Sequence, residues 1–474
     1  MTRGILLINS NITWPPVSPV GLEYVGEALV EADVPVQVLD LAFETDWKAA
    51  LRQSLKYDEP VVVGLTVRNT DDCCFASRKS FLPWLREVVK EVKKYASVPV
   101  FLGGVGFSTL PETVLRFTEA DGGIVGDGEE AVVALVNSLI KGEYGTRLPN
   151  MVYSLNNNII HNPRSDIDLK RLPVPRRRLF DNKRYQKYGA MVGIETKRGC
   201  AQKCIYCADP IAKGAKVRLR PAEVVVQEVR DLLEQGVSWF HLCDSEFNLP
   251  LEHAKDVCRS VIENGLGDRI RWYCYCAPVP FDSELAHLMK GAGCGGINFG
   301  VDSLCDEQLQ RLGRTHSTND IQQLVHLLKK EGLNYIFDLL IGGPGENVKT
   351  VRTTINRVSE FGVSLAGIAT GVRVYPGTPL GRTIDRGIIK EGLYPEANED
   401  PEQPVFYISP SLGDNAVSLV HDLAGGDKRF LLLSAPGEEG SYNYAGDELL
   451  SRLIEQGARG AYWDILRHHL YGNI

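Results

Sequence analysis

Three closely spaced cysteines, Cys200, Cys204 and Cys207, constrain this chain more than any other feature of its sequence. They follow the apolar run 191–194, which is typical of a strand, and they occupy the loop that leaves it. Thiols at this spacing can close around one metal centre, and thiolates suit zinc or an iron–sulfur cluster. Three protein ligands would leave one corner of a cluster open to a small molecule. The alternatives are a zinc site with a distant fourth ligand, or three buried free thiols.

Composition narrows the class of protein. The chain has 474 residues, 44% of them hydrophobic and 24% charged, as in an ordinary globular protein of about three domains. Its net charge of −8 argues against nucleic acid or an anionic membrane as the main partner. No apolar run approaches the roughly 20 residues that span a bilayer, and the first residues resemble a strand more than a signal peptide. We therefore expect a cytoplasmic protein whose cysteines are metal ligands or core residues before disulfides.

Residues 1–145 alternate between strand-like and helix-like runs, which predicts a doubly wound parallel sheet with helices on both faces. Such sheets bind ligands at the carboxyl ends of their strands. Three predicted strand ends lead into distinctive turns, at residues 68–72, 103–108 and 126–130. The glycines in the last two turns would let a bulky ligand approach the backbone closely.

Residues 188–385 resume the alternation, with six strand-like runs separated by helical patterns. In barrels built this way the active site lies at the carboxyl ends of the strands. Polar or glycine-rich turns follow four of these runs, at residues 244–248, 298–303, 342–346 and 375–380. One such turn would be weak evidence for a barrel. The order of all four turns behind the cysteine loop favours this fold.

The cysteine loop, with Tyr206 directly before its third cysteine, resembles that of the radical S-adenosylmethionine (SAM) enzymes. The resemblance implies a (βα)6 partial TIM barrel over 188–385 and a [4Fe–4S] cluster on the three cysteines, whose fourth iron binds SAM. Tyr375 is a candidate catalytic residue, and Asp302 stands where glutamate is more usual. The resemblance also implies that SAM is contacted by the following residues: Tyr206, Ser245, Glu246, Asn298, Asp302, Ser303, Gly342, Gly343, Pro344 and Glu346.

The pairing of GGxGxS at residues 103–108 with GDGEE at 126–130 resembles the cobalamin-binding domain of cobalamin-dependent radical SAM enzymes. The alternative is a domain that keeps this fold and has lost the ligand. The residues that the resemblance assigns to cobalamin are Thr66, Arg68, Asn69, Asp71, Gly103, Gly104, Gly106, Ser108, Gly126, Gly128 and Glu129.

One departure from that family concerns the lower face of cobalamin. Many relatives carry DxHxxG after the first strand, whereas this chain has no histidine there or elsewhere in residues 1–145. By resemblance to the family, Arg68 is our candidate for the lower face, with a catalytic role, and an arginine has no lone pair to donate to cobalt. An uncoordinated face would favour a nucleophilic Co(I) state. The alternative for Arg68 is a salt bridge with Asp71 or Asp72.

Two further segments complete the predicted organisation. Residues 146–187 form a linker, with a hairpin over 147–162 followed by a stiff, proline-containing stretch. Its basic residues favour an interdomain strap, or contacts to cobalamin, over a nucleic-acid patch. Residues 386–474 are too few for an independent enzyme, and we expect a small α+β domain that caps the open side of the barrel and shapes the substrate pocket.

These features predict a cobalamin-dependent radical SAM methyltransferase that moves a methyl group from SAM, via methylcobalamin, to a carbon of a small-molecule substrate. The mechanism implied by the resemblance uses a second SAM to generate a 5′-deoxyadenosyl radical, which abstracts hydrogen from that carbon. An electron donor such as flavodoxin or ferredoxin is expected as a partner. The alternatives are methylation without a radical, a non-methylating rearrangement or ring formation, and a cobalamin-binding regulator with an inert barrel.

Overall fold

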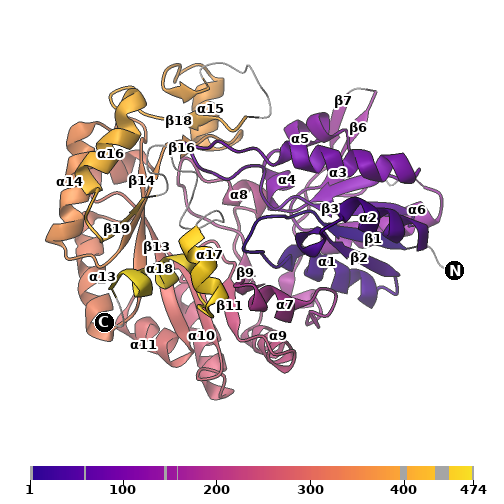
Figure 1. The fold of residues 1–474 in the computed structure, drawn as a ribbon, viewed down its shortest axis with the longest axis horizontal. Helices are drawn as coiled ribbons and strands as arrows, with labels where there is room; N and C mark the ends of the chain where they lie inside the picture. The colour runs from indigo at the N-terminus through magenta and orange to yellow at the C-terminus, as the bar shows by residue number, and fades with distance from the viewer. Residues whose placement is uncertain are drawn as a thin grey trace.

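The computed structural model describes residues 4–57, 60–143, 147–156, 158–395, 403–432 and 448–471. Two seven-stranded sheets, one in the amino-terminal part and one in the central part of the chain, lie beside each other (Figure 1). Both are α/β assemblies, so the predicted fold class is confirmed. The predicted boundary between residues 145 and 146 lies outside the described residues.

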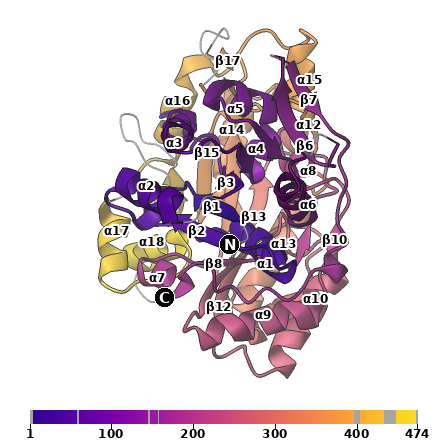
Figure 2. The same ribbon diagram turned by 90° about the vertical axis from the view of Figure 1, so that its right-hand side faces the viewer.

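The first sheet is doubly wound. Helices α1 (Val20–Glu31) and α6 (Glu129–Ile140) cover one face, while α2 (Trp47–Tyr57), α3 (Leu82–Tyr95) and α5 (Pro111–Thr118) cover the other (Figure 2). Side chains of the first strand alternate between these faces, because successive residues of a strand point to opposite sides. The parallel strands, in spatial order, are β2 (Val36–Asp40), β1 (Ile5–Asn9), β3 (Val62–Thr66), β4 (Val100–Gly103) and β5 (Gly122–Ile124).

The hairpin predicted in the linker extends this first sheet. Its strands are β6 (Met151–Leu155) and β7 (Asn158–His161), and β6 pairs antiparallel with β5, placing Met151 beside Ile124. The linker therefore begins as the edge of the amino-terminal sheet.

The second sheet forms an open barrel wall. Six of its parallel strands were expected, and a seventh comes from the carboxyl-terminal segment and pairs with β15. The helices that cover its outer face are α9 (Ala222–Glu234), α10 (Leu251–Glu263), α11 (Ser283–Gly291), α13 (Thr318–Glu331), α14 (Val348–Glu360) and α16 (Ala416–Ala424). The strands, in spatial order, are β8 (Val192–Ile194), β11 (Trp239–Leu242), β12 (Arg271–Cys276), β13 (Cys294–Asp302), β14 (Tyr335–Ile341), β15 (Ala366–Thr370) and β19 (Phe430–Leu432).

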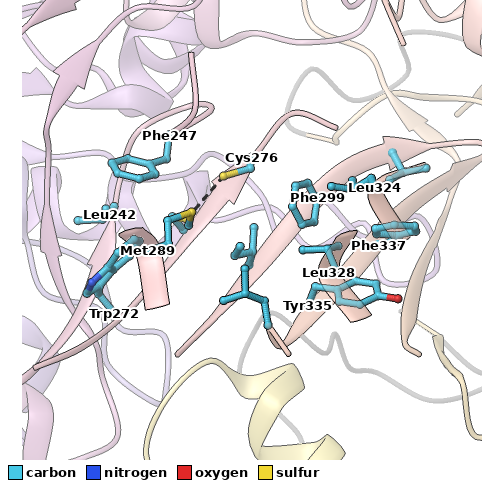
Figure 3. Packing of buried hydrophobic residues seen from close by; sticks show 14 of the residues in the cluster. Leu242, Phe247, Trp272, Cys276, Met289, Phe299, Leu324, Leu328, Tyr335 and Phe337 are labelled. Atoms are coloured by element: carbon cyan, nitrogen blue, oxygen red, sulfur yellow. Dashed lines mark hydrogen bonds between the residues drawn. The ribbon is translucent and has the colours of Figure 1, made fainter. Parts of the chain in front are cut away.

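The largest core lies between this sheet and its helices (Figure 3). Trp272 and Cys276 of β12 point into it, together with Phe299 and Phe337 from the next two strands. Residues between them, such as Tyr273, therefore face the concave side of the barrel wall. The alternation separates a packed outer face from an inner face that is free to line a site.

The carboxyl-terminal helices close the concave side at the amino ends of the strands. These helices are α17 (Glu448–Glu455) and α18 (Tyr462–Tyr471), and they pack with Tyr273 and Ile336 in a separate apolar cluster. Trp463 of α18 is 1% exposed, and its Nε1 donates a hydrogen bond to Asn298 Oδ1 at 2.6 Å. The carboxyl-terminal segment thus contributes directly to the floor of the barrel.

The linker joins the two sheets through one fully buried arginine. Arg177 donates from Nε to Glu23 of α1 at 2.5 Å and from Nη1 to Glu228 of α9 at 2.6 Å. All three side chains are 0% exposed. Because α1 belongs to the amino-terminal domain and α9 to the barrel, Arg177 connects the domains as an interdomain strap.

No helix among the described residues is long and apolar enough to cross a membrane.

The remaining elements are short. These elements are α4 (Val105–Thr109), α7 (Asn182–Lys187), β9 (Lys197–Arg198), α8 (Asp209–Ala212), β10 (Arg218–Leu219), α12 (Asp306–Arg311), β16 (Val372–Arg373), α15 (Pro379–Asp385), β17 (Leu393–Tyr394) and β18 (Phe406–Tyr407).

Candidate active site between the two domains

The cysteine loop lies between β9 and α8 and has a fixed backbone. Gly199 has φ +93°, and a Cβ there would lie 2.2 Å from the carbonyl oxygen of Lys216, so only glycine fits. The amide of Cys200 donates to Gly214 O at 3.0 Å. Cys200 and Cys204 are buried, Cys207 is half-buried, and all three are free thiols. The donor set fits an iron–sulfur cluster with one open position.

Arg314 is a charged neighbour of Cys204 in this loop, and the sequence analysis missed it. Its Nη1 lies 3.1 Å from Cys204 Sγ, and its Nε donates to Asp302 Oδ2 at 2.6 Å. Burial raises the pKa of the Cys204 thiol to about 11, and the positive charge of Arg314 opposes that shift. A guanidinium at this distance would stabilise a thiolate that binds metal.

Asp302 and Tyr206, both predicted as SAM contacts, are paired with each other. Tyr206 Oη donates to Asp302 Oδ2 at 2.6 Å, and the same carboxylate holds Arg314. The pair therefore anchors Tyr206 of the cysteine loop to Asp302 of β13. Nothing in the local sequence of Arg314 indicates this contact, because 110 residues separate it from Cys204.

Of three other predicted SAM residues, Ser245 and Glu246 follow the carboxyl end of β11, whereas Asn298 lies in the middle of β13. Glu246 is close to Arg314, its Oε2 is buried without a hydrogen-bond partner in the described part of the chain, and burial raises its pKa to about 7. Ser245 Oγ donates to Asp209, and Asn298 Nδ2 donates to Asp338 at 3.2 Å. Of the three, Glu246 keeps a polar atom available for a ligand.

The structure places two predicted residues in supporting roles. Ser303 is fully buried, and its hydroxyl pairs with Thr354 Oγ1 at 2.9 Å. Glu346 is also fully buried, and its Oε2 accepts hydrogen bonds from the amides of Gly342 and Gly343 at 2.6 and 3.1 Å. Its carboxylate thereby holds the turn that includes Pro344.

Asp71 and Tyr375 each take part in the contact between the domains, with different partners. Asp71 forms an ion pair with Arg373 at 2.8 Å, and Tyr375 Oη lies 3.3 Å from Cys73 Sγ. Asp71 and Cys73 belong to the loop after β3, whereas Arg373 and Tyr375 follow the sixth barrel strand. The structure thus gives both predicted residues a role in holding this loop against the barrel.

The two glycine-rich turns of the first domain form one surface. Gly104 has φ +101°, and a Cβ at Gly106 would lie 2.9 Å from Val67 O, so the turn after β4 requires small residues. Ser108 Oγ donates to Gly104 O at 2.9 Å and accepts from the amide of Gly126 at 3.0 Å. Ser108 therefore joins the turns that begin at Gly103 and Gly126, as the cobalamin motif implies.

The acidic part of the second turn reaches the barrel. Glu129 accepts a hydrogen bond from Arg198 Nη2 at 2.6 Å, and Asp127 forms ion pairs with Arg198 and Arg218. Arg198 stands only two residues before Cys200. The turn that begins beside Gly128 thus links the first domain to the start of the cysteine loop.

Two adjoining cavities lie at the junction of the domains. The smaller one has a volume of about 160 Å³ and enters the first domain between apolar side chains such as Leu7, Phe101 and Leu135. The larger one, of about 440 Å³, lies between the first domain and the barrel wall. Thr66 and Gly104 line both. An apolar cleft that opens from a glycine-rich rim into a wider space fits a large flat cofactor with a tail, as cobalamin has.

The larger cavity brings together side chains from both domains. Arg68 and Asn69 line it from the first domain, and Tyr462 and Trp463 line it from α18. The barrel strands contribute His241, Tyr275 and Asn298. His241 was missed from sequence, although a histidine at an inward position of an apolar strand is a readable signal.

Comparison with known proteins agrees with this geometry. The family model "B12 binding domain" matches residues 15–136, and the model "Radical SAM superfamily" matches residues 194–358. A tryptophan 2-C-methyltransferase from Streptomyces laurentii is 29% identical, over 80% of this chain and 74% of its own length. An uncharacterized methyltransferase from Pyrococcus horikoshii is 25% identical, over 76% of this chain and 77% of its own.

Solved structures give the same result. The radical SAM methyltransferase TsrM from Kitasatospora setae, with tryptophan and a SAM analogue bound, superposes with a TM-score of 0.90. It is 29% identical, and the match covers 99% of both chains. A TsrM structure with cobalamin and a [4Fe–4S] cluster has a TM-score of 0.91 at 27% identity, covering 99% of this chain and 98% of that one.

The two cofactor-binding domains and the cysteine loop define a radical SAM enzyme. More narrowly, the chain belongs to the cobalamin-dependent radical SAM family. The predicted family and the predicted cofactors, which are cobalamin, a [4Fe–4S] cluster and SAM, are therefore confirmed. The individual residues assigned to each cofactor stay predictions.

Proposed function

We propose that this enzyme transfers a methyl group from SAM, through cobalamin, to a carbon atom of an aromatic small molecule, with tryptophan or a related indole as the first candidate. The observation that carries the proposal is the cavity of about 440 Å³ between Arg68 and the aromatic inner wall of the barrel. The likeness to a tryptophan 2-C-methyltransferase over most of both chains supports the same substrate class.

Residues in different parts of the site would have different roles. Cys200, Cys204 and Cys207 would hold the cluster, and the turns around Gly104 and Gly126 would hold cobalamin. Cobalamin supplies a carrier for the methyl group between SAM and substrate. The chain itself positions the substrate and excludes water.

Arg68 would occupy the lower face of cobalamin. It lines the larger cavity beside Thr66 and Asn69. The carboxylate of Asp71, one of its alternative partners, pairs with Arg373 at 2.8 Å. A guanidinium carries no lone pair, so it would leave cobalt without a ligand on that face.

We further propose that a small redox protein such as flavodoxin or ferredoxin delivers electrons at the cysteine loop. Ala201 and Lys203 in this loop are exposed, whereas Cys200 and Cys204 beside them are buried. A partner that docks on these two residues would approach the cluster closely.

The proposal is tested by anaerobic incubation of the reconstituted enzyme with cobalamin, reductant, tryptophan and SAM carrying a labelled methyl group. Labelled methyltryptophan, identified by mass spectrometry, is the expected product. The release of 5′-deoxyadenosine would indicate a radical route, and its absence a polar one. Deoxyadenosine with no methylated product from tryptophan or from a panel of indoles would refute methyl transfer and favour a rearrangement.

A further inference from the structure

His241 lies in the wall of the larger cavity and has no role in the chemistry described so far. It is on β11, next to Gly193 of β8 and Tyr273 of β12. Its chain neighbours Phe240 and Leu242 pack into the outer core, so alternation turns His241 toward the concave side. The fold therefore places an imidazole on the same wall as Tyr275 and Asn298.

The ring of His241 is held in place, but its hydrogen-bonding capacity is not fully used by the described residues. It packs edge-on against Tyr275, with ring centroids 5.6 Å apart and planes at 89°. Its Nδ1 is buried and has no hydrogen-bond partner among the described residues. A buried polar atom without a partner is costly, so such an atom in a cavity wall points to a ligand that supplies the partner.

The surroundings keep this imidazole neutral. Burial lowers the pKa of His241 to about 4, and the positive charges of Arg68 and Lys213 lower it further, against a smaller opposing effect of Asp244. A neutral imidazole has one nitrogen that donates and one that accepts. Unlike an imidazolium, it can therefore accept a hydrogen bond from a substrate N–H or O–H.

Two other polar side chains that line the cavity, Asn298 and Asn11, are occupied or unsuitable. Asn298 accepts from Trp463 at 2.6 Å and donates to Asp338 at 3.2 Å. Asn11 also has a buried nitrogen, Nδ2, without a partner in the described part of the chain, but an amide nitrogen only donates. Asn11 moreover lies on the cobalamin side, in the loop after β1.

We propose that His241 accepts a hydrogen bond from the ring N–H of the aromatic substrate, and so selects substrates that carry an N–H or O–H at that position. This inference rests on the proposed function and adds to it a specificity-determining residue. It predicts that an isosteric analogue without the N–H binds and reacts poorly, because the acceptor nitrogen would stay buried and unpaired.

The experiment compares tryptophan with its benzothiophene analogue, in which sulfur replaces the ring N–H. The ratio of kcat/KM for the two compounds is measured with the reconstituted wild-type enzyme, H241F and H241Q. We expect a preference of about 10- to 100-fold for tryptophan in the wild type, about threefold or less in H241F, and an intermediate value in H241Q, which keeps an acceptor. Cobalamin absorbance and SAM binding check that each variant is folded.

A matched control is His253 of α10. It is another buried imidazole whose pKa is lowered by burial, but its Nε2 lies 3.1 Å from Thr196 O and it does not line the cavity. The H253Q variant should keep the wild-type ratio. An unchanged ratio in H241F, or equal methylation of both compounds by the wild type, would overturn the inference and leave the proposed function standing. No methylated product from either compound or from the indole panel would overturn both.

Discussion

The buried arginine of the linker offers a quantitative test of how the two domains are held together. Arg177 joins Glu23 and Glu228 across the domain interface, and all three side chains are 0% exposed. Replacing Arg177 with methionine keeps most of the side-chain volume and removes the charge. We expect this single change to be among the most destabilising available outside the cofactor sites.

The magnitude follows from the partners that remain. Without Arg177, Glu228 still has Arg220 at 2.8 Å and Tyr24 Oη at 3.0 Å. Among the described residues, Glu23 keeps only the amide of Asn182 at 2.8 Å and becomes a buried charge without a cation. Breaking a buried ion pair from one side costs about 3–5 kcal/mol, so R177M should lower the free energy of unfolding by about that amount.

The cost should depend on pH. Burial raises the pKa of Glu23 above 4.5 even beside Arg177, which opposes the shift. A carboxyl with a raised pKa in the folded state destabilises the fold as pH rises from its unfolded value through its folded value. Removing Arg177 raises that pKa further, so R177M should be more destabilised at pH 8 than at pH 5.5.

The assay is anaerobic urea denaturation at both pH values, followed by far-UV circular dichroism. In R177M/E23Q the unpaired charge is gone, and about half of the lost stability should return. The control is R259M, because Arg259 and Glu284 form an exposed pair at 2.5 Å, and its loss should cost far less stability than the loss of Arg177. Equal costs for R177M and R259M, or no dependence on pH, would refute the reasoning.

Three further predictions concern the cluster and its surroundings. C204A should lose the visible absorbance of the iron–sulfur cluster, and its methylation rate should fall at least 100-fold. It should still bind cobalamin, because the cobalamin turns lie on the other domain. R314M should reduce cluster content or methylation by roughly 10- to 100-fold, as expected when a partner that orients a metal ligand is removed. E346Q should flatten the loss of stability between pH 4.5 and 7, because burial raises the pKa of Glu346 to about 7. Denaturation curves across this pH range check the last prediction.

Each of these has a contrary outcome. A C204A enzyme with wild-type methylation would remove the cluster from the reaction. An R314M enzyme with normal cluster and activity would reduce Arg314 to a structural neighbour of Asp302. A stability profile of E346Q that follows the wild type would mean that Glu346 is not the group that titrates.

The sequence was sufficient for features that depend on local chemistry. The spacing of Cys200, Cys204 and Cys207 and the glycine at 199 lie within one loop, so a [4Fe–4S] cluster could be predicted without coordinates. The alternation of apolar runs likewise gave both parallel sheets, because helices and strands bury side chains with different periods. The glycine-rich turns were placed correctly, since small residues are required wherever backbone approaches backbone, as at Gly106.

Only the tertiary structure could decide which distant residues meet. Arg314 contacts Cys204 across 110 residues, and Trp463 contacts Asn298 across 165. The seventh barrel strand, β19, comes from the carboxyl-terminal segment, where the sequence indicated only a separate cap. In parallel sheets, neighbouring strands are separated by whole helices, so local pattern carries no information on their register.

The site itself shows the same division. Sequence named the turns of the first domain that line the larger cavity, at Arg68 and Gly104, because they end their own strands. It could not show that Glu129 binds Arg198, that Glu346 turns inward to hold its own loop, or that His241 and Arg68 line the same cavity. Those outcomes depend on how two separately folded sheets dock, and the docking is fixed by buried charges and side-chain volumes that only the assembled chain brings into contact.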